Sequence, residues 1–252
     1  AWLRTRRFWV QILASANFMQ NIKSISVMFP VFKDSKTVKK MIFESIKTLN
    51  KIKKKYEIII VDDGCPEKSG HLAQKLTKKI PNVKVIFHKK NLGYGAALKT
   101  GLKNCKYDWI FQLDGDAEYS VRDLGRLIKA AKNYNLVITY RYKKKYNTSR
   151  IIISWIYNKL LRILFKTRFR DISTGSRLVN SEILKKIKLE CNSPFLGAEL
   201  AIKAKKKGYR INELGIHTYP RTFGTGSSVG FKNIMLTIKD MMILYFKINL
   251  IK

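Results

Sequence analysis

The sequence predicts an α/β fold with a mostly parallel, Rossmann-like central sheet and helices on both faces. Short runs of β-branched residues alternate with longer stretches of helical periodicity from residue 24 onward. Two of the apolar runs end directly in acidic residues, at 62–63 and 114–118. Such ends are where the strands of an α/β sheet deliver ligand-binding groups. The alternation is typical of βαβ units, whose crossovers make the strands parallel.

The predicted elements follow the apolar periodicity. Strands are expected at 25–29, 57–61, 83–87, 109–113 and 136–140, with helices at 36–52, 70–79, 96–103 and 121–132. Ser120 with Asp123 fits a capping box, and Asp34 or Ser35 can cap the first helix. After residue 140 we expect a basic stretch at 141–145, a helix at 150–166, a polar turn at 171–175, a helix at 195–207, a strand at 210–216 and a glycine-rich loop at 224–230.

We expect three parts: an amphipathic N-terminal segment at 1–23, one globular domain at 24–228, and a C-terminal amphipathic helix at 229–252. The stretches 151–166 and 231–252 mix Ile, Leu, Phe, Trp and Tyr with Lys and Arg. Membrane-interface helices have this composition, and so do core helices with basic outer faces. No run of 18 apolar residues exists, so no spanning helix is expected. The apolar run after Arg7 imitates a signal peptide but is too short.

The charge balance points to an anionic partner. The chain has 51 Lys and Arg against 17 Asp and Glu, for a formal net charge of +34. Nucleic acid, acidic lipid headgroups and phosphorylated small molecules all satisfy this charge, and lysine-rich usage can also reflect genome composition. The three cysteines, Cys65, Cys105 and Cys191, are odd in number and have no C-x-x-C spacing. They argue against a disulfide framework and a zinc site, and favour a reducing compartment.

Three carboxylates fall within five residues, at Asp114, Asp116 and Glu118, directly after an apolar strand. Like charges this close raise one another's pKa unless a cation relieves them. Oxygen ligands of this kind select Mg²⁺ or Mn²⁺, which complete their shells with substrate phosphates. A solvated acidic turn is the alternative interpretation, and a cation site is the one that we favour.

Two further loops are expected at the same edge of the sheet. Asp62-Asp63-Gly64 ends another strand and could contact a base or ribose, although such a turn is often only a turn. The stretch 91–96 opens a helix but has Leu98 where a dinucleotide fingerprint needs its third glycine. The backbone amides of this stretch can still face an anion.

Taken together, residues 24–228 resemble the family 2 glycosyltransferases, most closely the branch that includes dolichyl-phosphate mannosyltransferase and related polyprenyl-phosphate sugar transferases. The resemblance is carried by the stretches 30–34, 61–65, 91–101 and 114–118, in that order. Further matches are Arg141, the pair Arg150 and Ser154, the set Asp171, Gly175 and Arg177, the helix residue Glu199, and the stretch 221–224. The chain departs from the family's pattern at Phe32 for Tyr, Asp34 for Glu, Glu118 for Gln, and Gly226-Ser227 for Ser-Lys.

The resemblance implies a GT-A fold and a set of site residues. It implies a nucleotide-sugar pocket formed by Pro30, Phe32, Asp34, Val61, Asp63, Asp114, Gly115 and Asp116. It implies a Mg²⁺ or Mn²⁺ ion at Asp114, Asp116 and Glu118, and an acceptor-phosphate site at Arg141, Arg150, Ser154 and Arg221. It gives catalytic roles to Asp116, Arg150, Arg221 and Glu199, while His217 is as readily structural as catalytic.

The implied reaction is inverting transfer of a hexose from a GDP- or UDP-linked sugar to a polyprenyl or dolichyl phosphate. A phosphate acceptor is largely ionised near neutral pH and needs no general base. The implied location is the cytoplasmic face of an anionic membrane, as a peripheral protein.

Two alternatives remain at this point. The first keeps the fold but transfers to a sugar hydroxyl, with Glu199 as general base. The second is a non-enzymatic nucleic-acid-binding protein that grips phosphates through the lysine runs 143–145 and 205–207. We do not expect nucleic acid as a partner, because that hypothesis leaves the acids at 114–118 without a role.

Overall fold

The computed structural model describes residues 22–142, 148–221 and 230–250. They form a seven-stranded sheet in the order β3-β2-β1-β4-β6-β5-β7. The strands are β1 (Ser24–Val31), β2 (Lys55–Asp62), β3 (Val83–Phe87), β4 (Trp109–Gln112), β5 (Leu136–Arg141), β6 (Arg177–Asn180) and β7 (Ile211–Ile216). Only β6 is antiparallel to its neighbours in this sheet. The predicted α/β fold with a mostly parallel sheet is therefore confirmed.

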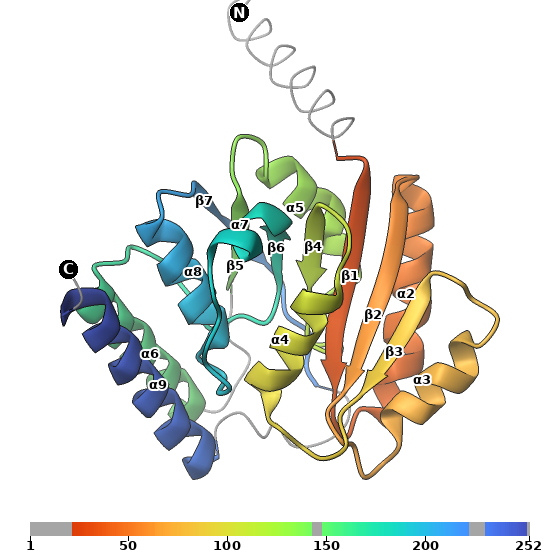
Figure 1. The fold of residues 1–252 in the computed structure, drawn as a ribbon, viewed down its shortest axis with the longest axis horizontal. Coiled ribbons are helices and arrows are strands. Elements are labelled where there is room, and N and C mark those ends of the chain that lie inside the picture. Colours follow the sequence, from red (N-terminus) through yellow and green to blue (C-terminus); the bar gives the residue numbers. More distant parts are fainter. Residues whose placement is uncertain (1–21, 143–147, 222–229, 251–252) are drawn as a thin grey trace, which may run out of the picture.

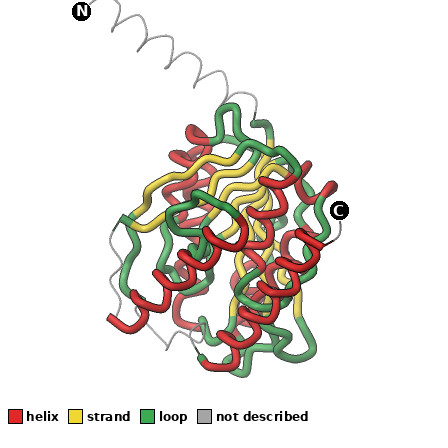
Figure 2. Tube along the Cα trace, turned by 90° about the vertical axis from the view of Figure 1, so that its left-hand side faces the viewer, coloured by secondary structure: helices red, strands yellow, loops and turns green. Residues whose placement is uncertain are grey.

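Helices cover both faces of the sheet (Figures 1 and 2). They are α2 (Ser35–Ile52), α3 (Ser69–Thr77), α4 (Tyr94–Asn104), the 3₁₀ turn η1 (Val121–Asp123), α5 (Leu124–Ala130), α6 (Thr148–Phe165), α7 (Ser181–Lys186), α8 (Leu196–Lys206) and α9 (Phe231–Leu250). Side chains of α2, α3 and α5 join the apolar core on one face of the sheet, and side chains of α4, α6, α8 and α9 join the core on the other. Both faces of the strands are thus buried, as expected in a doubly covered parallel sheet.

The alternation of β1 illustrates how the two cores form. Its residues Ile25, Val27 and Phe29 join the core on the α2 side, whereas Met28 joins the core on the α4 side. Successive side chains of a strand point to opposite faces, so one apolar run supplies both cores. The ends of β1, β2 and β4 then converge at one edge of the sheet.

The prediction missed β6 and α7. The strand has four residues, starts with Arg177 and ends with Asn180, so it has no long apolar run to reveal it. Asn180 instead caps α7 by accepting a hydrogen bond from the amide of Glu182. The antiparallel pairing of β6 with β4 and β5 could not be predicted from crossover rules, which address parallel strands.

The predicted caps are only partly correct. Ser120 does cap the turn η1, accepting from the amide of Arg122. Asp34 precedes α2, yet its side chain makes no capping hydrogen bond there. The Asp34 carboxylate accepts instead from the amide of Phe32 and from Arg221.

Helix α9 lies beside α6 at one end of the molecule (Figure 1), where Phe165 and Tyr245 are in edge contact. Polar contacts also tie α9 to the body: Asp240 accepts from the amide of Ser193, and Lys247 pairs with Glu190 at 2.8 Å. Both helices keep large apolar side chains exposed. Those on α6 are Ile151, Ile152, Ile153, Trp155, Ile156, Leu160 and Ile163, and those on α9 are Phe231, Met235, Leu236, Ile238, Ile243 and Phe246.

In the described part of the chain, no helix combines the length and apolarity needed to cross a membrane. The N-terminal segment, apart from Ile22 and Lys23, and most of the glycine-rich loop lie outside the described residues. The departures at Gly226-Ser227 and the lysine run 143–145 lie outside them as well.

Candidate active site

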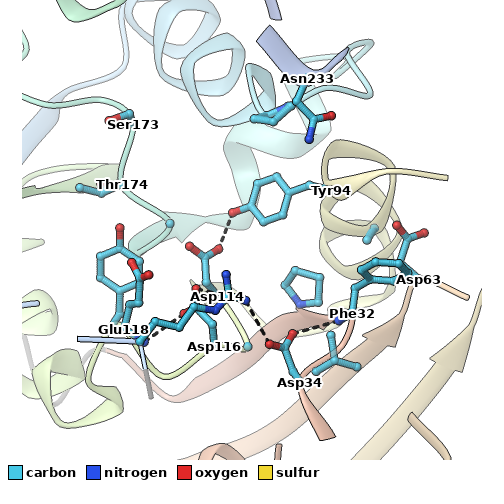
Figure 3. A pocket seen from close by; sticks show the side chains of 18 of the residues that line it. Phe32, Asp34, Asp63, Tyr94, Asp114, Asp116, Glu118, Ser173, Thr174 and Asn233 are labelled. Atoms are coloured by element: carbon cyan, nitrogen blue, oxygen red, sulfur yellow. Dashed lines mark hydrogen bonds and ion pairs between the residues drawn. The ribbon is translucent and has the colours of Figure 1, made fainter. Parts of the chain in front are cut away.

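A cleft of about 500 Å³ opens where the ends of β1, β2 and β4 meet the start of α4 (Figure 3). Its lining includes most of the site residues expected from the sequence: Pro30, Phe32, Asp34, Asp63, Asp114, Gly115, Asp116, Glu118, Arg141, Arg150 and Arg221. Val61, Ser154 and Glu199 are not part of this lining. The carboxyl edge of the sheet is the usual ligand site of α/β folds.

The acids after β4 are held in a fixed turn. Ala117 adopts a left-handed conformation at φ 61°, and the amide of Glu118 donates to Asp116 Oδ1 at 3.0 Å. Gly115 lies so close to β1 that a Cβ there would stand 2.4 Å from the carbonyl oxygen of Pro30. A side chain at this position would therefore push the acidic turn away from β1.

Burial makes these acids costly to ionise. Burial, together with the charges of Asp114 and Glu118, raises the pKa of Asp116 to about 7. Burial also raises the pKa of Asp114 to about 6, although the hydroxyl of Tyr94 donates a hydrogen bond to Asp114 Oδ1 and opposes the shift. Neighbouring half-buried carboxylates of this kind suit a bound cation, which would offset both the burial and the mutual repulsion.

The full three-carboxylate ion site is not preformed. Within residues 22–142, 148–221 and 230–250, no group of three His, Cys, Asp or Glu side chains is arranged to hold a metal ion. Asp114 and Asp116 nevertheless both line the cleft, and their oxygen atoms are the ligand type that Mg²⁺ and Mn²⁺ prefer. The donor set fits an ion that takes its remaining ligands from a substrate and water.

Arg221 links the acids of two strand ends. Its Nη2 lies 3.4 Å from Asp34 Oδ1 and 3.9 Å from Asp116 Oδ2. Burial raises the pKa of Asp34, while the amide of Phe32 and the charge of Arg221 act in the opposite direction. A guanidinium between two carboxylates can also serve a phosphate that enters the cleft.

The loop after β2 is built around its two acids. Asp62 accepts from the amides of Cys65 and Gly70 and so holds the connection to α3. Asp63 accepts from the amides of Leu92 and Gly93, and its Oδ1 lies 2.7 Å from His88 Nδ1. Asp63 therefore faces the cleft and also positions the turn before α4.

Arg141 is fixed by a buried polar network. Its Nε and Nη2 both lie 2.8 Å from Asp171 Oδ2, and Nη2 also donates to Ser173 Oγ. The second oxygen of Asp171 accepts from Asn158 on α6, whose side-chain oxygen accepts from the amide of Ile172. The network joins α6 to the 171–175 turn and holds the Arg141 guanidinium at the cleft.

Glu199 lies away from the cleft, inside the protein. Its carboxylate accepts from the amides of Glu190 and Cys191 and pairs with Lys203 at 2.6 Å. These contacts give it a structural role beneath the loop 190–195, so we do not propose it as a general base. His217, also outside the cleft, packs its ring against Tyr142.

Arg177, which the family resemblance had matched without a role, also lines the cleft. Lining residues that the sequence gave no role include Tyr94, Thr174 and Asn233. Tyr94 stands inside the stretch 91–101 that carries the family resemblance, so its position could have been noticed. Asn233 comes from the first turn of α9 and points toward the cleft (Figure 3). One polar residue in an amphipathic helix gives no signal of such a position.

Comparisons with known proteins find similar sequences and similar folds. Glycosyltransferase AglD of Haloferax volcanii is 22% identical over 207 residues, which cover 78% of this chain and 33% of that protein. The chain thus spans about a third of the length of this relative.

Solved structures share the fold. Glucosyl-3-phosphoglycerate synthase from Mycobacterium tuberculosis, in complex with Mn²⁺, uridine diphosphate and phosphoglyceric acid, has a TM-score of 0.73 at 14% identity, covering 92% of this chain and 81% of that chain. Its complex with Mg²⁺ and uridine diphosphate has a TM-score of 0.72 at 15% identity, covering 92% and 82%.

The sequence profile described as Glycosyl transferase family 2 matches residues 26–188. This match covers well over half of the chain and includes the strand ends that form the cleft. The chain belongs to glycosyl transferase family 2.

Proposed function

We propose that this chain is a metal-dependent, inverting glycosyltransferase that moves a hexose from a nucleotide sugar to a polyprenyl or dolichyl phosphate at a membrane surface. One observation carries the proposal: the half-buried carboxylates Asp114 and Asp116 line the same cleft as the arginines Arg141, Arg150 and Arg221. The carboxylates suit a cation that binds a diphosphate, and the arginines suit a second phosphate.

The donor is assigned to the part of the cleft beside β1 and β2. Pro30, Phe32, Asp34 and Asp63 would contact the nucleoside, with Gly115 beneath it. Val61, which belongs to the buried core, is left out of this set. The synthase from M. tuberculosis has been solved with uridine diphosphate and with uridine-diphosphate-glucose, and this supports a nucleotide sugar as the donor.

Asp114 and Asp116 would hold a Mg²⁺ or Mn²⁺ ion, with Glu118 beside them. When bound, the ion offsets negative charge on the departing diphosphate. Asp116 must lose its proton for this task, so its raised pKa makes ion binding sensitive to pH near neutrality. The complexes of the synthase with Mn²⁺ or Mg²⁺ support this assignment.

The acceptor phosphate is assigned to Arg141 and Arg150, with Arg221 between the two substrates. An oxygen of this phosphate attacks C1 of the hexose, the bond from C1 to the donor's diphosphate breaks, and the nucleoside diphosphate leaves. The phosphate is already ionised near neutral pH, so the arginines hold and orient it and no base is required. Ser154 lies on the same helix as Arg150 but is not in the cleft lining.

A lipid acceptor is favoured by where the exposed apolar helices begin. Helix α6 places Arg150 in the cleft from its first turn, and α9 places Asn233 there from its own. From these starts both helices carry exposed apolar side chains, including Trp155, Ile163 and Phe231. An interfacial helix buries such a face among acidic headgroups, which the positive charge of the chain would attract. The cytoplasmic leaflet is the proposed location.

A small phosphorylated acceptor is the second candidate, because solved structures of the same fold contain phosphoglyceric acid. It would use the same arginines and would need no membrane. The hypothesis of a sugar hydroxyl as acceptor needs a general base, and Glu199 does not fit that role because it pairs with Lys203 and does not line the cleft.

The test is a transfer assay with labelled UDP- and GDP-hexoses, Mn²⁺ or Mg²⁺, and either polyprenyl phosphate in vesicles or 3-phosphoglycerate. We expect label in the organic phase with the wild type, and at least about a hundredfold less with Asp116→Asn. The exposed Asp108 provides the matched control Asp108→Asn, which should retain activity. Label found only in 3-phosphoglycerate would select the second candidate, and no transfer from any donor would refute both.

A further inference from the structure

His88 is a polar residue at the end of β3 that the proposed reaction does not use, and its side chain is 8% exposed. Its amide donates to the carbonyl oxygen of Asp62 at 2.9 Å, which continues the pairing of β3 with β2. Phe87, one residue earlier, contacts His71 of α3. Because successive side chains of a strand point to opposite faces, the His88 ring points to the face of the sheet that α4 covers.

Both ring nitrogens of His88 have hydrogen-bond partners. Nδ1 lies 2.7 Å from Asp63 Oδ1, and Nε2 lies 2.9 Å from the Oγ1 of Thr100 on α4. An ionised carboxylate only accepts hydrogen bonds, so we assign the ring hydrogen to Nδ1, which donates to Asp63. Nε2 of a neutral ring then accepts from the Thr100 hydroxyl. The three side chains thus form a chain of hydrogen bonds from α4 through His88 to Asp63.

Of these three residues, Asp63 lines the cleft, whereas His88 and Thr100 do not. The Asp63 side chain is only 4% exposed, so the direction of its carboxylate decides which oxygen a ligand can meet. The amides of Leu92 and Gly93 donate to Oδ1 and Oδ2, respectively. With His88 as the third donor, Oδ1 is engaged twice and Oδ2 once. Oδ2 therefore keeps the greater capacity to accept a hydrogen bond from a ligand.

A carboxylate, an imidazole and a hydroxyl in this order also occur in hydrolases, where the hydroxyl attacks the substrate. Thr100 does not fit the role of a nucleophile, because it stands inside α4 and does not line the cleft. The hydrogen bonds instead anchor the Asp63 carboxylate to the helix. Their effect is to fix its direction.

We infer that His88 is a positioning residue for the donor: with Thr100 behind it, His88 holds the Asp63 carboxylate so that Oδ2 accepts a hydrogen bond from the nucleoside. His88 itself does not touch the substrate. This inference rests on the proposed function, because it requires a nucleotide sugar beside Asp63. It also restricts the nucleoside, which must present an N–H or O–H group to Asp63, since an ionised carboxylate supplies only acceptors.

A purely structural role for His88 is the competing explanation. The contact with Thr100 joins the end of β3 to α4. The turn after Asp63 also packs tightly, since a Cβ at Gly64 would stand 2.4 Å from the carbonyl carbon of Lys90. If His88 only holds these segments together, its loss loosens the whole site. Ligands with and without a nucleoside would then bind more weakly to the same degree.

The experiment measures binding of UDP and GDP by equilibrium titration with Mg²⁺, and of inorganic pyrophosphate by competition with the bound nucleotide. Thr100→Val removes the hydroxyl and keeps the branched shape, whereas Thr100→Ser keeps the hydroxyl. For the nucleotide that the wild type binds, we expect about 3- to 10-fold weaker binding in Thr100→Val and about 10- to 30-fold weaker binding in His88→Leu. Thr100→Ser should bind like the wild type, and pyrophosphate should bind all variants within about twofold.

Thr77 on α3 provides a matched control. Its side chain is also partnered, because its hydroxyl donates to the carbonyl oxygen of Ala73, and it lies outside the cleft lining. Thr77→Val removes one hydroxyl hydrogen bond in a helix, as Thr100→Val does. We expect Thr77→Val to bind the nucleotide with wild-type affinity.

The outcomes separate this inference from the proposed function. If the wild type binds a nucleotide and Thr100→Val binds it equally well, the positioning role is refuted and the proposed function stands. Equal weakening of nucleotide and pyrophosphate, or an equal loss in Thr77→Val, also refutes the positioning role. Binding of neither nucleotide by the wild type refutes the proposed function and this inference together. The two Thr100 variants keep the test decisive if His88→Leu does not fold.

Discussion

At the scale of single residues, the folded protein without a metal ion disfavours the ionised forms of Asp114 and Asp116. Their pKa values are raised mainly by burial, and the two acids also repel each other. Arg221 lies within 3.9 Å of Asp116 and offsets only part of this effect. A residue arrangement of this kind lowers folding stability in exchange for a binding site.

Asp116→Asn should stabilise the metal-free protein at alkaline pH. The pKa of Asp116 is about 7 in the folded state and 3.8 as a reference. The folded state therefore binds the proton more tightly, and its stability falls as the pH rises from about 4 through 7. We expect Asn to raise the free energy of unfolding by on the order of 1 to 3 kcal/mol at pH 8 and by little at pH 3.5. Urea unfolding with a chelator measures this, and an equal effect at both pH values would contradict it.

Asp171→Asn should weaken acceptor binding more than donor binding. Asp171 pairs with Arg141, and both side chains are less than a tenth exposed. Removing this charge leaves a buried guanidinium without its counterion, which costs about 3 kcal/mol of unfolding free energy. We expect KM for the acceptor to rise about tenfold, with KM for the donor little changed. The more exposed pair of Asp123 and Arg126 provides a control, and Asp123→Asn should alter stability by less than about 1 kcal/mol.

The site residues that could be predicted are those that neighbouring sequence marks, and the others depend on contacts that form only in the folded protein. The acids at 114–118 follow an apolar strand, so composition and position already indicate a ligand site there. Arg141 and Arg150 came from the family resemblance, and both line the cleft. Glu199 came from the same resemblance, but its partners Lys203 and the amides of 190–191 become visible only once α8 is packed. The pairing of Tyr94 with Asp114 likewise depends on tertiary structure.

At the scale of elements, the loop 190–195 connects the start of α4, beside the cleft, with α9. The carbonyl oxygen of Asn192 accepts from the amide of Gly95 at the start of α4, and Pro194 lines the cleft. On its other side the loop meets α9 through Ser193 and Asp240. Glu199 holds the beginning of this loop from below. The same buried carboxylate therefore supports an active-site wall and a surface helix.

Glu199→Gln should affect stability without removing a catalytic base. The change removes the negative charge that pairs with Lys203 at 2.6 Å and leaves one amide oxygen where two carboxylate oxygens accepted from the amides of Glu190 and Cys191. We expect a loss of about 2 to 3 kcal/mol in unfolding free energy and an unchanged shape of the pH–rate profile. The exposed pair of Glu182 and Lys185 gives the control Glu182→Gln, with little effect on stability. Loss of the acidic limb of the profile in a fully stable Glu199→Gln protein would restore Glu199 as a base.

The elements that were predicted well have long periodic runs. Strand β1 and helix α2 each differ from the predicted bounds by two residues or fewer at either end. The elements that were missed, β6 and α7, are four and six residues long. Each has only two apolar residues, which stand beside polar ones such as Arg177, Asn180 and Lys186. The position of β6 is set by its pairing with β4 and β5, which no local pattern encodes, and α7 follows directly from the end of β6.

At the scale of the whole molecule, a net charge of +34 is combined with an exposed apolar surface on α6 and α9. Charge attracts the protein to any polyanion, and this attraction weakens when salt shortens the Debye length. Apolar contact distinguishes a membrane from nucleic acid, because only the membrane can bury Trp155 or Ile163. The lysine run 205–207 favours neither, since Lys205 and Lys206 donate to the carbonyl oxygens of Lys166 and Ile248.

Vesicle binding should therefore depend on both salt and apolar side chains. Trp155 is 54% exposed on α6, and Phe43, on α2, is 45% exposed. We expect Trp155→Ser to weaken binding to phosphatidylserine vesicles about tenfold at moderate salt, while Phe43→Ser has little effect. Co-sedimentation over a salt series measures both contributions. Equal losses in the two variants would show that α6 is not the docking face.

Helices α6 and α9 both begin at the cleft, and this bears on which chain lengths of polyprenyl phosphate the protein can use as acceptor. If Arg150 and Asn233 meet the head of a lipid while the apolar sides of their helices lie in the bilayer, the isoprenoid tail never enters the protein. Carriers with different numbers of isoprene units would then be glycosylated with the same kcat. Tail length would alter only how long each carrier remains in the bilayer.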